Sequence, residues 1–301
     1  MIEVWYTLVD SIFPFGWVEF DFMKNALLAV LLVSPIFGFL GTIVVNNNMA
    51  FFSDAIGHAA LTGIAIGVLL GLGDPLWAML IFAAVLAIAI TWTRHRTGAS
   101  VDTVIGVFFS TAVALGVVIL SRGGGFNRYS HYLIGDLLSI SPQELTLLVI
   151  ALLVVLLFWG LFFNRLFLAS INQAVARSRG VNVYMMEMLF SILLALIVTV
   201  SIQWIGILII NALLILPAAS ARNLAANMRS YHFLAVMISI AAGLTGLFLS
   251  YQWGTATGAT IVLCIFILYL GTIAWKTVRS GWNKHRSETD RVKSTTDHKA
   301  G

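Results

Sequence analysis

Nine long apolar runs divide the sequence, and they restrict its fold more than any other feature. A helix needs about 20 residues to cross the hydrocarbon core of a bilayer. The Val, Ile and Leu residues of these runs do not alternate with polar residues, as the strands of a membrane barrel would require. We therefore predict an all-α, polytopic membrane bundle of about nine transmembrane helices. Its predicted spans are 23–45, 50–72, 75–93, 102–121, 143–163, 183–202, 204–225, 231–250 and 254–275.

The composition excludes several other classes of protein. Hydrophobic residues make up 60% of the 301 and charged residues only 10%, whereas an average soluble domain is about 25% charged. The single cysteine, Cys264, excludes an internal disulfide and a multi-cysteine metal cluster. No Gly-Lys dipeptide occurs, so the chain has no phosphate-binding P-loop and any ATP hydrolysis must come from a partner.

The distribution of Lys and Arg predicts the orientation, because positive charge is retained on the cytoplasmic side. Loops on one side hold three such residues, Lys24, Arg122 and Arg128. This side is predicted to be outside and to carry the N-terminus. The net charge of +4 is then explained by topology, and we expect no nucleic-acid partner. The cytoplasmic side, with the C-terminus, holds fourteen: Arg94, Arg96, Arg165, Arg177, Arg179, Arg222, Arg229 and seven from Lys276 to Lys299.

The chain divides into three segments by composition. Residues 1–22 mix acidic and aromatic side chains, which is typical of an interfacial segment. Residues 23–275 form the predicted transmembrane domain. Residues 276–301 form a polar tail of mixed charge that we expect to be disordered in the cytoplasm.

Asp54 and His58 are ionisable residues within the second predicted span. They are four residues apart and therefore project from one face of a helix. A charged group inside a bilayer costs at least about 2.5 kcal/mol, so such a residue points to a function. Carboxylate oxygen together with imidazole nitrogen suits zinc, manganese or ferrous iron, and an incomplete ligand set lets an ion leave. Alternatively, both side chains form ordinary hydrogen bonds between helices.

Small and helix-bending residues mark two further places in the spans. Gly63, Gly67 and Gly71 repeat every four residues, a pattern that allows close packing of membrane helices. Asn211 and Pro217 lie in the seventh span. A proline there frees a backbone carbonyl, so these two residues are candidates for lining an ion's path, with a simple packing kink as the alternative.

The loop between the fifth and sixth spans is rich in alanine and predicts a short helix that ends at Gly180. This helix is expected to lie along the cytoplasmic face. It could dock into a groove on a soluble partner, or anchor the loop through contacts of arginine with phosphate groups. Glu187 lies one turn inside the next span and is interpreted as an interfacial cap or the partner of a nearby Arg.

Four blocks of sequence together resemble the permease subunit of bacterial ABC importers for zinc, manganese or iron. They are Ser-Asp-Ala-Ile-Gly-His-Ala-Ala-Leu from Ser53, Val-Asp-Thr-Val-Ile-Gly from Val101, Tyr-Leu-Ile-Gly-Asp-Leu-Leu from Tyr132, and Ile-Gly-Ile-Leu-Ile-Ile-Asn-Ala-Leu-Leu-Ile-Leu-Pro-Ala-Ala from Ile205. The resemblance extends from about residue 25 to 270 and is greatest to the zinc-uptake members. The chain departs from the family's pattern where it has Ala256 and Ala259 in place of prolines.

The resemblance implies a permease homodimer in the bacterial plasma membrane, with cytoplasmic ATP-binding subunits and an extracytoplasmic metal-binding protein. It implies that Asp54 and His58 contact the metal, which is cargo; no cofactor is expected. It also implies that the short cytoplasmic helix contacts the ATPase, although family members usually have acidic residues where this chain has Asn172, Gln173 and Ala174. The residues assigned to this contact are Asn172, Gln173, Ala174, Ala176, Arg177 and Gly180.

Other functions stay open at this point. A proton-coupled secondary transporter could use Asp54, His58 and Glu187. A membrane enzyme would need a second cluster of nucleophile and base, which we do not find in the sequence, and no His-Glu-x-x-His motif occurs. A structural anchor would tolerate leucine in place of Asp54. We therefore predict a transport permease that is not itself an enzyme.

Overall fold

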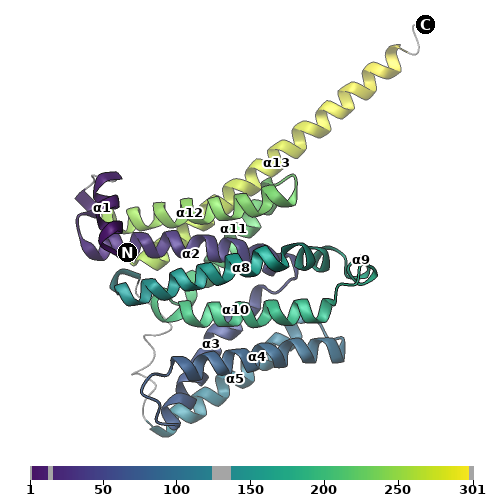
Figure 1. The fold of residues 1–301 in the computed structure, drawn as a ribbon. Coiled ribbons are helices and arrows are strands. Elements are labelled where there is room, and N and C mark those ends of the chain that lie inside the picture. Colours follow the sequence, from purple (N-terminus) through teal and green to yellow (C-terminus); the bar gives the residue numbers. More distant parts are fainter. Residues whose placement is uncertain (1, 13–15, 124–136, 298–301) are drawn as a thin grey trace.

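Helices account for the architecture of the computed structural model, which describes residues 2–12, 16–123 and 137–297 (Figure 1). Within these residues nine helices are long and apolar enough to span a membrane, so the predicted all-α bundle is confirmed. The orientation of the termini stays a prediction. The nine helices are α2 Asp21–Asn46, α3 Ala50–Leu69, α4 Leu76–Thr97, α5 Val101–Gly123, α8 Pro142–Ile171, α10 Val183–Ile205, α11 Ile207–Leu224, α12 Met228–Trp253 and α13 Thr257–Asp297.

The long helices pack as two groups. In one, α12 packs on α2, α11 and α13, α11 also packs on α2 and α13, and α8 packs on α2. In the other, α3 packs on α4 and α5, and α10 packs on α4. Figure 1 shows α2, α8 and α12 on one side and α3, α4 and α5 on the other, with α10 between them. The two groups meet where α10 contacts α8 and α11, and where α11 contacts α3.

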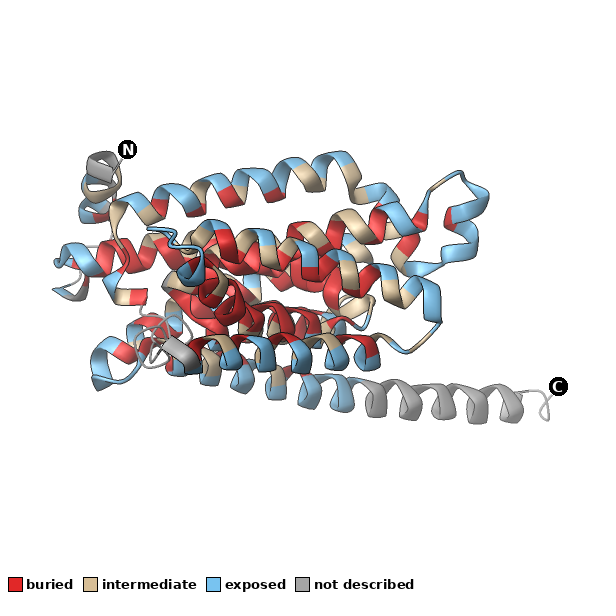
Figure 2. Cartoon of the chain, turned by 90° about the horizontal axis from the view of Figure 1, so that it is seen from below, coloured by how far each residue is buried: buried red, intermediate tan, exposed pale blue. Residues whose placement is uncertain are grey.

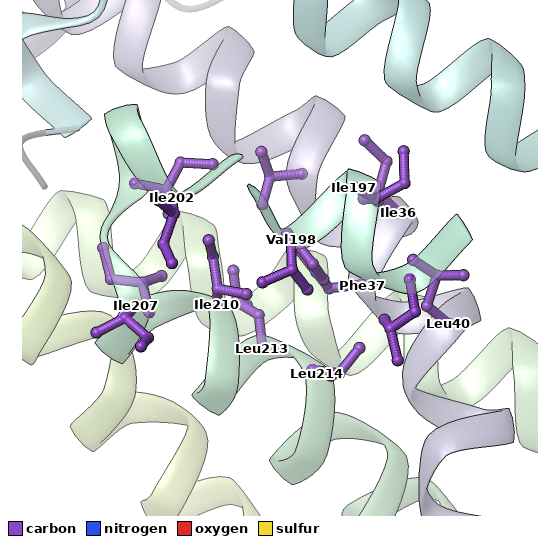
Figure 3. Close-up of a cluster of buried hydrophobic side chains, with 14 of the residues drawn as sticks. Ile36, Phe37, Leu40, Ile197, Val198, Ile202, Ile207, Ile210, Leu213 and Leu214 are labelled. Atoms are coloured by element: carbon purple, nitrogen blue, oxygen red, sulfur yellow. The ribbon is translucent and has the colours of Figure 1, made fainter. Parts of the chain in front are cut away.

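Interlocking hydrophobic side chains fill the region where α2, α10 and α11 meet (Figure 3). All are nearly or completely buried. Lipid is as apolar as these side chains, so close packing and dispersion forces hold the helices together here. The labelled members of this cluster are Ile36, Phe37, Leu40, Ile197, Val198, Ile202, Ile207, Ile210, Leu213 and Leu214.

The outer faces of several spans are apolar and exposed. In α8 only 22% of the most apolar window is buried within the chain, and Leu153, Leu157 and Leu161 form an exposed stripe at helical spacing. Figure 2 shows buried positions concentrated at the centre and exposed ones on the outer helix faces. Such a surface is suited to contact with lipid acyl chains.

The three glycines of the repeat that begins in α3 have different environments. A Cβ atom on Gly63 would lie 2.6 Å from the Met79 Cα, and one on Gly67 would lie 3.1 Å from the Ala78 Cβ, so both face α4 closely. Gly71 was expected to share in this packing, but α3 ends at Leu69. Gly71 instead has a φ of 67°, and a Cβ atom added to it would meet nothing within 4 Å. It follows the end of the helix in the left-handed conformation that glycine adopts easily.

The N-terminal segment contains α1 Ile2–Ile12 and the 3-10 helix η1 Gly16–Val18. Polar contacts fasten α1 to the first turn of α2. The Trp5 Nε1 donates to the Lys24 carbonyl oxygen at 3.0 Å, and the Tyr6 hydroxyl donates to the Asn25 Oδ1 at 2.8 Å. Lys24 is buried, and its Nζ lies 2.7 Å from the Asp10 Oδ1. The segment is therefore held at one end of the bundle, and its contact with the membrane interface stays a prediction.

A helix extends into the polar tail, whose disorder stays a prediction. In the structure α13 continues past residue 276 to Asp297, and Figure 1 shows this part extending beyond the other helices. Residues 276–297 contain no proline and one glycine, Gly281. Nothing in this stretch therefore ends the helix that the last span begins.

Candidate functional site

Asp54 and His58 lie on one face of α3, one helical turn apart, and are partly exposed. Their side chains are 41% and 36% accessible, whereas the other residues from Phe52 to Gly67, except Ile66, are buried against neighbouring helices. The two side chains therefore occupy a narrow open strip along a largely buried helix.

Asn211 of α11 joins this pair. Its Nδ2 donates to the Asp54 Oδ1 at 2.7 Å, and the His58 Nε2 lies 3.5 Å from the same oxygen. We call Asp54, His58 and Asn211 the polar cluster. The Asn211 Oδ1 is buried and has no hydrogen-bond partner. The cluster thus contains a carboxylate, an imidazole and an unpaired amide oxygen.

The polar cluster lies far from the C-terminal end of α11. Asn211 is near the start of α11, and the other end of this helix is at Leu224. At a rise of about 1.5 Å per residue, the contact with Asp54 is roughly 20 Å from that end. The ring of Phe109, on α5, packs edge-on against His58 with 5.7 Å between centroids. An apolar wall on one side and an open strip on the other thus bound the imidazole.

Pro217 is also in α11 but is not part of the polar cluster. It lies six residues beyond Asn211, about 9 Å along the helix axis, and it is buried. Because proline has no backbone N–H, the helix lacks one internal hydrogen bond at this point. A role of Pro217 in lining a path stays a prediction.

The short helix expected between the fifth and sixth spans is present as α9 Gln173–Ser178. The Asn172 Oδ1 accepts from the backbone N–H groups of Ala174 and Val175, which caps the helix. Ala176 is fully buried, whereas Arg177 is exposed. Gly180 has a φ of 74° and follows the end of the helix. The cap and the glycine fix where this helix begins and ends.

Glu187 lies near the start of α10 and is 8% exposed. The sequence predicts an interfacial cap or an arginine partner, and the Arg94 Nη1 lies 3.4 Å from the Glu187 Oε2. His95 and Gln173 also contact this carboxylate, and neither contact was predicted. We call Glu187, Arg94, His95 and Gln173 the Glu187 cluster.

The Glu187 cluster and the polar cluster are far apart. Ile202 packs against Gly57, next to His58, and is fifteen residues further along α10 than Glu187. That spacing corresponds to roughly 20 Å along the helix. A direct proton relay from Asp54 and His58 to Glu187 is therefore not supported by this arrangement.

A closed metal site within one chain is not found among the described residues. No group of three or more His, Cys, Asp or Glu side chains is placed there so that it could hold a metal ion. The polar cluster supplies one carboxylate and one imidazole, and a structural zinc site would have four protein ligands. Its chemistry suits weak and reversible contact with a cation.

A model of the ABC 3 transport family matches residues 19–276. The chain belongs to the ABC 3 transport family. The match includes both clusters and all nine spans that the sequence predicts. Residues 132–136, which begin one of the resembling sequence blocks, lie outside the described residues.

Two known bacterial proteins are similar to this chain over most of their length. The high-affinity zinc uptake system membrane protein ZnuB of Haemophilus influenzae is 34% identical over 252 residues, which are 83% of this chain and 96% of that protein. The manganese import system permease protein ScaB of Streptococcus gordonii is 30% identical over 255 residues, 85% of this chain and 91% of that protein.

A solved structure agrees with this relationship. PsaBC from Streptococcus pneumoniae in complex with Fab contains a chain with a TM-score of 0.73 and 29% sequence identity. The similarity covers 90% of this chain and 95% of that chain. Together with the nine apolar helices, the family makes this chain a multi-pass permease of the bacterial plasma membrane and not itself an enzyme.

Proposed function

We propose that this chain is the membrane permease of an ATP-driven importer that passes a divalent metal ion, zinc or manganese, through the polar cluster. Its relatives are named for zinc uptake and for manganese import. The observation that carries the proposal is that Asp54, His58 and Asn211 converge from two helices on one open strip of α3.

The donor atoms of the cluster suit such an ion. Carboxylate oxygen and imidazole nitrogen bind both zinc and manganese. The unpaired Asn211 Oδ1 adds a third donor, since a half-turn of the amide about its terminal bond exchanges the nitrogen that now faces Asp54 for the oxygen. In the structure the amide nitrogen holds the carboxylate in place, and after the half-turn the amide oxygen would be the atom that ligates the ion. Few ligands leave the ion free to exit.

A second copy of the permease is the proposed cover for the open strip. A carboxylate with 41% of its side chain exposed is costly to leave facing lipid. A two-fold dimer places the same strip of each copy against the other. This arrangement would bring two carboxylates and two imidazoles to one passage and would shield them from lipid.

Partner chains supply the energy and the ion in this proposal. The chain lacks a P-loop, so two ATP-binding subunits act on the cytoplasmic face, where α9 is the proposed contact. An extracytoplasmic metal-binding protein delivers the ion at the other end. ATP binding and hydrolysis then open the passage alternately to the two sides. The excess of Lys and Arg around α9 supports its cytoplasmic placement.

The test is uptake by proteoliposomes that contain the permease, its ATP-binding subunits and the loaded metal-binding protein. Asp54→Ala and His58→Ala should each abolish ATP-dependent zinc and manganese uptake, while Asp74→Ala, an exposed carboxylate in the turn before α4, should not. Parental uptake rates in both cluster variants would show that the site is assigned wrongly. Competition between zinc and manganese at buffered free concentrations then ranks the two ions.

Uptake driven by a proton gradient in vesicles without ATP-binding subunits would instead favour a secondary transporter. The separation of Glu187 from the polar cluster gives no support to that alternative.

A further inference from the structure

The Glu187 carboxylate is shared among three helices. Its Oε1 accepts a hydrogen bond from the Gln173 Nε2 at 3.1 Å, at the first residue of α9. Its Oε2 lies 2.7 Å from the His95 Nε2 and 3.4 Å from the Arg94 Nη1, in the last turn of α4. One side chain on α10 thus connects α9 to α4, and each oxygen serves a different neighbour.

The Glu187 carboxylate is buried, so its oxygens need hydrogen-bond donors at fixed positions. Glu187 is 8% exposed, and the side chains of Arg94 and His95 are 23% and 25% exposed. A buried carboxylate is costly unless several donors satisfy its oxygens. An ion pair of this kind often contributes little net stability compared with apolar packing. What this ion pair contributes is therefore that it fixes the positions of the surrounding helices relative to one another.

The other attachments of α9 reach only its immediate chain neighbours among the described contacts. Ala176 packs in a small buried cluster with Ala169 of α8 and Val183 of α10. Asn172 ends α8 and caps α9. Through Glu187, in contrast, α9 is connected to α4, which is distant in the sequence.

From α4 the connection continues to the polar cluster. α4 lies against Gly63 and Gly67 of α3 with no room for a side chain at Gly63. α3 carries Asp54 and His58. A displacement that reaches α4 as a rigid body therefore also moves the helix that holds the ion's contacts.

We propose that Glu187 is a positioning residue that locks α9 to α4 and α10, so that movement of α9 by an ATP-binding subunit displaces these helices together. Without the lock, α9 is held by the Ala176 cluster and by its flanking residues, Asn172 and Gly180, and it can move without α4. This inference rests on the proposed function. In this inference, Glu187 and Gln173 determine how efficiently ATP hydrolysis is converted into transport.

The experiment measures zinc uptake and ATP hydrolysis in the same proteoliposomes of the complete importer, and the result is the number of ions per ATP. Loss of folded protein lowers both rates together and leaves this ratio unchanged. Gln173→Ala and Glu187→Ala should each lower the ratio roughly tenfold, as expected when a hydrogen bond to a charged group is lost. The double variant should be no worse than Glu187→Ala, because both changes remove the same contact.

Asp74→Ala is the matched control, since it removes an exposed carboxylate at the opposite end of α4 and should keep the parental ratio. Parental ratios in Gln173→Ala and Glu187→Ala would overturn the inference, as would a double variant whose deficit is the product of the two single ones. If Glu187→Ala does not assemble, Gln173→Ala decides alone, because Gln173 is exposed. Absence of ATP-driven uptake by the parental importer would instead refute the proposed function.

Discussion

Replacing Gly63 by alanine tests how tightly α3 is held against α4. The new Cβ would lie 2.6 Å from the Met79 Cα and 3.1 Å from the Met79 nitrogen. Carbon atoms in contact are normally about 3.5–4.0 Å apart, so the two backbones must separate by about 1 Å. Overpacking of this kind costs about 1–3 kcal/mol. Alanine also favours a helix over glycine by about 1 kcal/mol, which partly offsets the cost.

Gly160→Ala is the matched control, because Gly160 lies within α8 and a Cβ there meets nothing within 4 Å. Both variants gain the same helix preference, so the difference between them isolates the overpacking, about 1–3 kcal/mol. We expect Gly63→Ala to be less stable than Gly160→Ala by this amount when unfolding is followed by circular dichroism during titration of detergent-solubilised protein with sodium dodecyl sulfate. Equal stability of the two variants would refute the close approach of α3 and α4.

Three further predictions concern local structure. Asn172→Ala removes the cap of α9, worth about 1 kcal/mol, and should speed hydrogen exchange in α9 about fivefold; unchanged exchange would contradict the cap. Lys24→Met leaves Asp10 without its ion pair and should raise hydrogen exchange in α1 but not in the long helices; protection of α1 at the parental level would show that other contacts suffice. Ser141→Ala breaks the capping box with Glu144 at the start of α8 and should lower the unfolding free energy by about 1 kcal/mol, whereas a stability equal to the parental protein would exclude a role for this cap.

The spans could be predicted because their signal is contained in local sequence. A run of about 20 apolar residues has few structures open to it other than a membrane helix. The shared face of Asp54 and His58 follows in the same way from their spacing of four residues. Gly71 shows the limit of such patterns, since the periodicity continues to it but the helix ends two residues earlier.

The contacts between helices could not be predicted in this way. Asn211 is 157 residues from Asp54 in the sequence, and no local pattern states which helices are neighbours. Asn211 was a candidate only because it is polar and lies within a span. Likewise, an arginine partner for Glu187 could be expected from charge, whereas His95 and Gln173 join it only because α4, α9 and α10 meet at one point.

The hydrogen bond from Asn211 to Asp54 connects α11, in one group of helices, to α3, in the other. At 2.7 Å it is lost once its atoms separate by about 1 Å more, because a hydrogen bond weakens steeply beyond roughly 3.5 Å. Sliding of the two halves past each other by this distance therefore frees the carboxylate oxygen from the Asn211 amide. A small mechanical displacement is in this way converted into a change in how readily the carboxylate oxygen can bind a passing cation.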